Sequence, residues 1–413
     1  MRINYIKIGK NNKGGNLNMK KTKRQNGITL VALVITIIIL LILATISIQS
    51  LTNTGLFAKA QEAKEKTRNA EENQARTLNE YEDELNKYIS GNVKTPIKKV
   101  TDNIGSVLST TDNTELQDAY GNKIVVPAGF KIVSDSTTSN AQTVDKGIVV
   151  EDATVDSEGK ATATAGSQFV WIPVGKIYTD DQKTGENAKI IELGRYSFDS
   201  NGIKSAYLGS WVEENANDAS TLKNWGNTIA KNITNFKTSV ATNGGYYIGR
   251  YEARTTTARN SKGDSLTQIT EKGTDQVYNY VTQLQAAQLA QNMYNSNKFI
   301  SDLMNSYAWD TATLFLQTCG EDKYSIKKSV NSSLACKGTN SLDYTETRDN
   351  VCNIYDMASN VAEWTTETTT YSDLPCVSRG SGYDYSDGYT NNRYPGNTYI
   401  SDDNLGFRPL LFI

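Results

Sequence analysis

Two kinds of hydrophobic pattern divide this chain. Residues 28–48 form a nearly unbroken apolar run, and no charged residue occurs from 25 to 58. Beyond residue 100 the apolar runs are short and lie between clusters of Gly, Asn, Asp, Ser and Thr, a pattern typical of strands joined by turns. The first pattern predicts one long helix, and the second predicts a β-rich domain.

The short apolar runs predict strands at 123–126, 147–150, 169–174 and 410–413. Two stretches with apolar residues at helical spacing, 276–294 and 301–317, interrupt these runs. Because strands are mixed with a pair of helices, we place the fold in the α+β class.

We divide the chain into five parts by composition. They are a basic leader (1–27), a transmembrane helix (28–50), a helical stalk rich in Ala, Glu, Lys and Gln (51–90), a linker with a small β region (91–165), and the main domain (166–413). The sequence leaves open whether residues 100–165 form a small β subdomain or an extension of the main fold.

The apolar run predicts a membrane anchor. It is long enough to cross a bilayer as a helix. Residues 1–24 hold eight basic residues and no acidic one, so we expect the N-terminus to stay in the cytoplasm and the main domain to lie outside the cell. We therefore expect a single-pass protein of the cell membrane. The alternative is a cleaved secretory signal, but its apolar part would be shorter.

The composition excludes several functions. Histidine is absent, which removes every mechanism that needs an imidazole as base, metal ligand or activator of a nucleophile. Residues 25–413 carry 35 basic and 45 acidic residues, a net charge of −10. An acidic body argues against a nucleic-acid partner.

The four cysteines are compatible with several arrangements. None of Cys319, Cys336, Cys352 and Cys376 has the spacing of a CxxC pair, so we do not expect a zinc or redox site. Outside the cell they can form two disulfides in three ways, or remain buried thiols.

A tyrosine-rich segment near the C-terminus is the candidate binding face. Of the 24 residues from 381 to 404, sixteen are Tyr, Asp, Asn or Ser, and none is Leu, Val, Phe or Trp. Tyrosine offers a large amphipathic surface with few torsions, and the small polar residues offer adaptable hydrogen bonds, as in antigen-binding loops. The alternative is an ordinary polar loop region. The candidate ligand-binding residues are Tyr383, Asp384, Tyr385, Asp387, Tyr389, Asn391, Asn392, Tyr394, Asn397, Tyr399 and Asp402.

The start of the chain resembles the signal of type IV pilin-like proteins. The stretch KKTKRQNG is followed by ITLVALVI, and in that family a basic leader ends in Gly before a long apolar helix. The resemblance implies that a prepilin peptidase cuts after Gly27, that Ile28 becomes the new N-terminus, and that pilin-like subunits are partners. Ala32 stands where pilins carry a Glu that contacts a neighbouring subunit.

Four ordered motifs resemble the formylglycine-generating-enzyme-like (sulfatase-modifying-factor) domain, a variant of the C-type lectin fold. They are GYYIGRYEAR at 245–254, YDMASNVAEW at 355–364, SRGSGY at 378–383 and LGFRP at 405–409. The resemblance implies that this fold covers the main domain. It also implies scaffold roles for Asn360, Glu363, Trp364, Arg379, Gly406, Phe407 and Arg408.

The catalytic residues of that family have no counterpart here. Its copper-dependent members use a pair of cysteines after the third motif, whereas this chain has no Cys beyond Cys376. Its iron-dependent relatives use histidines. We therefore expect no enzymatic activity and a structural role for acids such as Glu363. We expect no cofactor, although Asp and Asn oxygens in lectin-like loops can supply calcium ligands.

A lectin-like domain that ends in a segment dense in Tyr, Asn, Asp and Ser is similar to the variable proteins of diversity-generating retroelements. That resemblance implies a surface-displayed protein whose C-terminal face binds an extracellular ligand or another cell. The alternatives are a divergent sulfatase-modifying-type oxidase and a minor pilin subunit.

Overall fold

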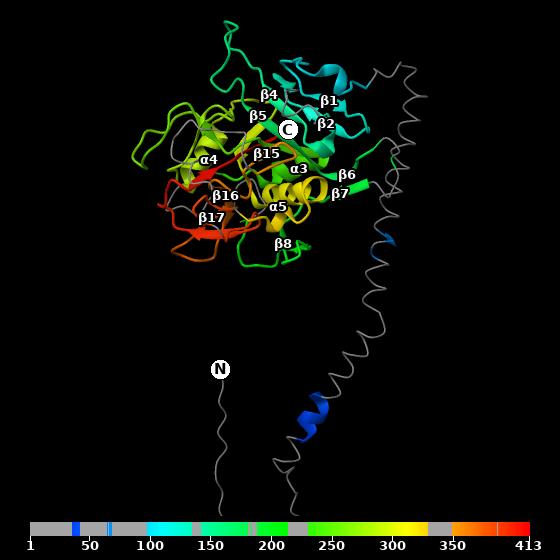
Figure 1. Ribbon diagram of the computed structural model, residues 1–413, viewed down its shortest axis with the longest axis vertical. Coiled ribbons are helices and arrows are strands. Elements are labelled where there is room, and N and C mark those ends of the chain that lie inside the picture. Colours follow the sequence, from blue (N-terminus) through cyan, green and yellow to red (C-terminus); the bar gives the residue numbers. More distant parts are fainter. Residues whose placement is uncertain are drawn as a thin grey trace, which may run out of the picture. The chain divides into compact units, whose positions relative to one another are not determined.

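The computed structural model describes residues 35–41, 64, 66–67, 97–133, 142–180, 183, 188–213, 230–328, 349–385 and 387–413 (Figure 1). The chain divides into two compact units, Met1–Lys94 and Thr95–Ile413. In the first unit residues 35–41 are helical, and so are 64 and 66–67. Within these described stretches, no helix combines the length and apolar character of a membrane span. The rest of the predicted leader, anchor and stalk, including Gly27 and Ile28, lies outside the described residues.

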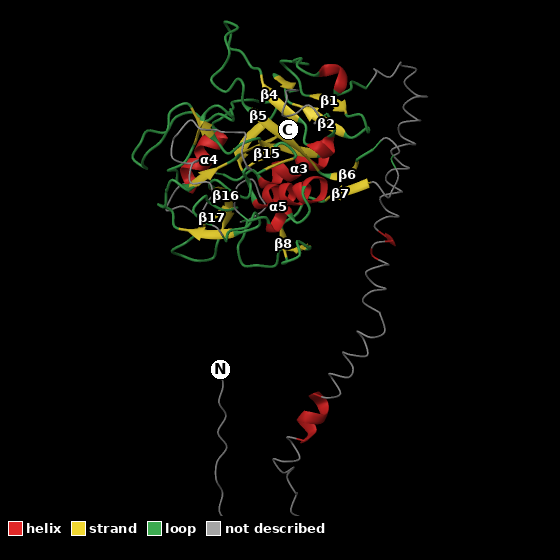
Figure 2. Ribbon diagram, viewed as in Figure 1, coloured by secondary structure: helices red, strands yellow, loops and turns green. Residues whose placement is uncertain are grey.

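The second unit is built around a six-stranded antiparallel sheet (Figure 2). Its order is β13 (Ile300–Leu303), β20 (Pro409–Phe412), β10 (Gly245–Gly249), β5 (Gln168–Pro173), β4 (Val149–Asp152) and β3 (Phe130–Ile132). Every residue of β10 and β20 is buried, because other elements cover both faces of the sheet.

Neighbouring tyrosines of β10 identify what covers each face. Tyr246 packs its ring 5.1 Å from that of Phe236 in α3 (Ile233–Asn243) and donates to the carbonyl of Ala308 in α5 (Ser306–Phe315). Tyr247 points to the opposite face, where its hydroxyl donates to the carbonyl of Val125. Helices α3 and α5 therefore cover one face, and the hairpin that contains Val125 covers the other.

A second sheet carries the C-terminal segment. Its order is β18 (Arg393–Gly396), β17 (Cys376–Arg379), β16 (Ala362–Thr368) and β19 (Leu405–Phe407), with β16 and β19 parallel. Helix α4 (Gln283–Gln291) contacts both β16 and β13 and so joins the two sheets.

The remaining elements are short. The two-stranded pairs are β1 (Thr114–Gln117) with β2 (Lys123–Val126), β6 (Gly175–Tyr178) with β7 (Ala188–Ile191), β8 (Tyr196–Phe198) with β9 (Lys204–Ala206), β11 (Arg254–Thr255) with β12 (Gln276–Val277), and β14 (Asn350–Val351) with β15 (Ile354–Tyr355). The short helices are η1 (Thr101–Asn103), η2 (Val144–Lys146), η3 (Leu316–Gly320) and η4 (Tyr324–Ile326).

The described fold is mixed and mostly β with few helices, which agrees with the predicted α+β class. The strands predicted at 123–126, 147–150, 169–174 and 410–413 correspond to β2, β4, β5 and β20, with shifts of up to two residues. The described residues of 97–133 and 142–165 extend the main fold, because β4 pairs directly with β5. The boundary predicted at 165 therefore falls inside one sheet.

Both predicted helices are shorter than their patterns, and a third helix was missed. Helix α4 begins only after Thr282, where a capping box with Gln285 satisfies the first backbone N–H groups. Helix α5 begins only after Asn305, whose side chain accepts from Ala308 N, because residues 300–303 pair with β20 instead. Helix α3 has the polar sequence ITNFKTSVATN, whose apolar stripe is narrow.

Asp302 in β13 provides a test of this packing through pH. Its carboxylate accepts from Gln291 Nε2 at 2.9 Å and from Leu303 N at 2.8 Å. Burial raises the pKa of Asp302 to about 6. The carboxyl of an unfolded aspartate has a pKa of about 3.9, so the folded state holds the proton more tightly. The free energy of unfolding therefore falls as the pH rises from about 4 through 6.

We expect Asp302→Asn to remove this pH dependence. The free energy of unfolding of the variant, relative to the parent, should rise by about 2 kcal/mol between pH 4 and pH 7.5. Urea unfolding of both proteins at the two pH values measures it, with the exposed Glu158→Gln as control. If the difference in unfolding free energy between parent and variant were the same at both pH values, burial would not hold the proton on Asp302.

Candidate functional site

Two of the four sequence motifs meet at a buried hydrogen bond. Asn360 donates from its amide to the carboxylate of Glu252, which also accepts from Val361 N at 3.0 Å. Asn360 has φ +68°, a left-handed conformation that Asn adopts more readily than most residues. Burial and the nearby Asp356 carboxylate raise the pKa of Glu252. The motifs at 245–254 and 355–364 thus form one structural unit.

The last motif joins the same unit through Arg408. Its guanidinium contacts Glu363 at 2.6 Å and donates to the carbonyls of Gly249 and Tyr355. Arg408 and Glu363 are both buried. All these partners belong to the motifs, so the scaffold residues hold the two sheets together.

Other scaffold residues fill the space around this pair. Trp364 is buried and donates from Nε1 to the carbonyl of Val281 at 2.8 Å. Phe407 packs 5.8 Å from the ring of Tyr278. At Gly406 a Cβ atom would lie 2.7 Å from Val361, so a larger residue would not fit there.

A buried ion network fixes the strands that carry the candidate face. Arg379, at the end of β17, contacts Asp310 of α5 at 2.5 Å and Glu367 of β16 at 3.4 Å. Arg393, at the start of β18, contacts the same two carboxylates at 2.5 and 3.0 Å. Arg195 adds a further contact to Glu367. Both ends of the loop 380–392 are therefore tied to the same two acids.

The loop between these arginines is held through its backbone. Trp309 Nε1 donates to the carbonyl of Thr390 at 3.1 Å, and Arg379 Nε donates to the carbonyl of Asn392 at 2.9 Å. Tyr383 N donates to the carbonyl of Asn360 at 2.7 Å. Gly380 has φ +75°, and a Cβ atom there would lie 2.7 Å from the carbonyl of Met357. Only glycine suits that position.

The predicted face residues lie at the surface on two loops, 380–392 and 397–404, and at the start of β18. Tyr385 is 57% exposed and Tyr399 is 68% exposed. Asp384, Asp387 and Asp402 are also exposed. The half-buried members are Tyr383, Tyr389, Asn391, Asn392, Tyr394 and Asn397. In Figure 1 the sheet with β16 and β17, which carries these loops, lies well apart from the hairpin β1–β2.

Side-chain contacts join the two loops. Tyr383 donates from its hydroxyl to Asp403 at 2.9 Å, and Asn404 donates to Asp384 at 2.9 Å. These contacts bring the early part of the first loop against the end of the second.

A separate contact lies beside them. The rings of Tyr385 and Tyr394 lie 5.8 Å apart, and Asn392 donates to the hydroxyl of Tyr394. The hydrogen bonds and ring contacts of the described residues do not link Tyr399 or Asn397 to this pair. The structure therefore brings the first loop and β18 into one cluster and leaves Tyr399 apart.

Sequence reasoning missed several residues of this region. Lys328 lies 3.2 Å from Asp387 and 5.8 Å from the ring centre of Tyr389. Tyr207 packs against both Arg393, at 4.0 Å, and Arg195. Lys328 and Tyr207 lie in polar segments far from residues 381–404 in the sequence, and no sequence pattern distinguishes them. Asp403 could have been predicted, because it lies in the same segment next to Asp402.

The described cysteines are poor candidates for chemistry. Burial raises the pKa of Cys319 and of Cys376 to about 12 and that of Cys352 still further. A thiol with so high a pKa is a weak nucleophile at neutral pH. Cys319 and Cys352 are not joined by a disulfide, and Cys336 lies outside the described residues.

No group of three or more Asp, Glu or Cys side chains that could hold a metal occurs in the described part of the chain. The expectation of calcium ligands stays a prediction.

We expect Arg379→Met to lower the free energy of unfolding by about 3 kcal/mol, because it leaves buried carboxylates short of a partner. Urea unfolding measures this change. Lys328→Met, which breaks an exposed ion pair of the same region, serves as matched control and should leave the unfolding midpoint unchanged. Equal effects of the two changes would mean that the buried network does not support the loop.

Comparisons with known proteins give no family. No family model and no curated protein matches the chain. Among solved structures it is similar to Treponema denticola variable protein 1, at 13% identity and a TM-score of 0.30, over 61% of this chain and 98% of that one. It is also similar to CarF, at 14% identity and a TM-score of 0.25, over 33% and 67%. Scores this low establish neither fold nor function. The resemblances to pilin-like and formylglycine-generating-enzyme-like proteins stay predictions.

Proposed function

We propose that this chain is a non-catalytic ligand-binding protein of the cell surface, with the segment 381–404 as its binding face. The observation that carries the proposal is the exposure of Tyr and Asp side chains on loops whose ends are fixed by a buried ion network. Loops fixed in advance lose less conformational freedom when a ligand binds. Tyrosine adds a large amphipathic contact surface.

The loop contacts also support the proposal that the face is variable in sequence. The first loop keeps its path largely through backbone groups, such as the carbonyls of Thr390 and Asn392 and the N–H groups of Tyr383 and Asn391. Any non-proline residue supplies these backbone groups. Exposed side chains such as Tyr385 can therefore change without altering the path of the loop. Diversification of the kind that retroelement systems produce would be tolerated here.

Binding is favoured over the two alternative functions. The chain lacks histidine, and the raised pKa values of Cys319, Cys352 and Cys376 disfavour thiolate chemistry, which speaks against an oxidase. For a minor pilin, the absence of Glu at Ala32 removes a contact that pilin subunits use.

Surface display is part of the proposal. It rests on the apolar run 28–48 after a basic leader. Cleavage after Gly27 by a prepilin peptidase would leave Ile28 at the N-terminus, with the domain outside the cell. Display of many copies would strengthen individually weak contacts.

A display library tests the binding face. We would randomise the exposed positions Asp384, Tyr385, Asp387, Tyr399 and Asp402 in the full-length chain and select against immobilised hen lysozyme. Most members should resist proteolysis like the parent, because changes at exposed positions typically alter stability by less than about 0.5 kcal/mol. Selection should return binders with dissociation constants on the order of micromolar or below.

The control library randomises five exposed positions of α3. These are Thr234, Asn235, Thr238, Ala241 and Thr242. It should stay folded but return far fewer binders, since one helix face offers neither the tyrosines nor the two adjacent loops of the candidate face. The proposal fails if the face library loses its folded state or if it yields no more binders than the control.

Processing of the anchor is tested separately. In the native host, the mature chain should begin at Ile28, and Gly27→Val should retain the leader. Mass spectrometry of the N-terminal peptide distinguishes the two forms, and Gly15→Val in the same leader is the control. Protease added to intact cells should digest the main domain. A domain that stays protected would contradict surface display.

A further inference from the structure

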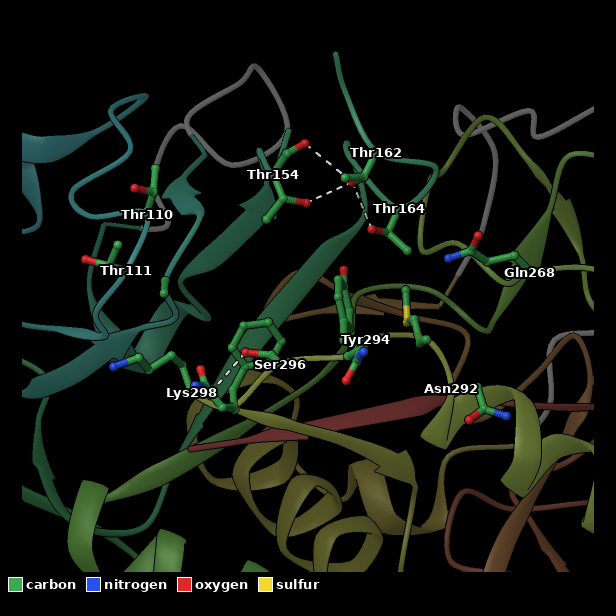
Figure 3. A pocket seen from close by; sticks show the side chains of 15 residues that line it. Thr110, Thr111, Thr154, Thr162, Thr164, Gln268, Asn292, Tyr294, Ser296 and Lys298 are labelled. Carbon is green, nitrogen blue, oxygen red and sulfur yellow. Dashed lines mark hydrogen bonds between the residues drawn. The ribbon is translucent and has the colours of Figure 1, made fainter. Parts of the chain in front are cut away.

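We propose that a pocket lined by hydroxyl, amide and C–H groups, distant in sequence from the tyrosine-rich face, is a binding site for a neutral carbohydrate. The pocket has a volume of about 840 Å³ and is lined by loops next to β1, β3 and β4, by the loop between β11 and β12, and by residues 292–299 between α4 and β13 (Figure 3). No residue of the segment 381–404 lines it. Its volume falls within the range typical of sites for small molecules.

The lining is rich in hydroxyl and amide groups. It contains five threonines, one serine, three asparagines and one glutamine, against three apolar residues, Ala128, Met293 and Phe299. Groups of this kind both donate and accept hydrogen bonds without carrying charge. A sugar presents the matching combination of hydroxyl groups and C–H surface.

The charges at the pocket disfavour an ionic ligand. Lys298 is the one charged residue of the lining, and its ammonium lies 3.0 Å from Asp112. An anion would therefore compete with a carboxylate for its only cation. No carboxylate is among the lining residues, so a cation would find no partner either. A neutral polar ligand avoids both penalties.

A chain of hydroxyl groups gives the pocket a defined polarity. Thr154 Oγ1 lies 2.6 Å from Asp152 Oδ1 and 2.8 Å from Thr162 Oγ1, which in turn lies 3.3 Å from Thr164 Oγ1. Thr154 donates to the carboxylate of Asp152. The hydroxyl of Thr162 lies within reach of both Thr154 Oγ1 and the carbonyl of Thr154, and either can accept its proton. With their protons engaged, Thr154 and Thr162 can offer lone pairs to a ligand. Figure 3 shows these hydroxyls gathered on one side of the pocket.

Aromatic rings pack behind the segment 292–299 of the wall. Tyr294 and Phe299 pack with Phe130 and Phe169, with ring centres 5.4–6.2 Å apart. Asn113 donates to the carbonyl of Lys298 at 2.7 Å and ties the same segment to the loop before β1. The hydroxyl of Tyr294 donates to Asp152 at 3.1 Å, so this aromatic segment adjoins the hydroxyl chain. Met293 and Phe299 of the same segment give the lining the C–H surface that a sugar ring would contact beside the hydroxyl groups.

The test uses the full-length chain in a polyoxyethylene detergent, which carries no sugar headgroup. The chain is applied to an array of neutral, sialylated and sulfated oligosaccharides, and the best neutral hit is titrated by calorimetry. We expect neutral glycans to bind. Thr162→Val, which removes one hydroxyl at constant shape, and Asn295→Ala with Asn297→Ala, on the exposed rim, should each weaken binding at least about tenfold.

Two controls separate this site from the tyrosine-rich face. Thr238→Val on α3 and Tyr399→Ala on the face should leave glycan affinity unchanged, and all variants should keep the parent's unfolding midpoint. Absence of any neutral glycan binding would overturn the proposal, as would a preference for sialylated or sulfated glycans. Loss of binding with Tyr399→Ala but not with the pocket variants would place the glycan on the face instead.

Discussion

The candidate face depends on two buried carboxylates, Asp310 and Glu367, that share the same pair of arginines. Asp310 contacts both Arg379 and Arg393, and so does Glu367. Buried charges are tolerated only when their partners are held in good geometry, because the desolvation penalty is large. Since the arginines stand at the two ends of loop 380–392, neither end can shift without separating charges inside the domain. The buried network therefore fixes the geometry of the loop 380–392.

This arrangement separates the frame from the face. The frame contacts of the loop are made by buried side chains such as Trp309 and by backbone groups. The face contacts, such as Tyr385 with Tyr394, join side chains near the surface. Loss of a frame contact leaves a buried polar group without a hydrogen-bond partner. Loss of a face contact leaves a group that can bond to water instead. Sequence change is therefore far less costly at the face than beneath it.

Sequence reasoning succeeds here where structure is local and fails where it depends on distant partners. Strand β2 and the polar loops that carry Tyr385 and Tyr399 have clear local patterns. Residues 301–303 begin the stretch predicted to be helical but lie in β13, because they pair with β20 about a hundred residues later. Lys328 likewise reaches Asp387 only in the folded chain. Composition identified the candidate face, but not the network beneath it.

The two proposed sites differ in how much change each tolerates. In the pocket, the hydroxyl chain ends on Asp152, which is buried and also accepts from Tyr294. Replacing Thr154 would remove a donor from a buried carboxylate, which costs more than the bond itself is worth. At the face, the side chain of Tyr399 is 68% exposed, so replacing it does not leave a buried polar group without a partner. If both sites bind, the pocket would retain a constant specificity while the face changes.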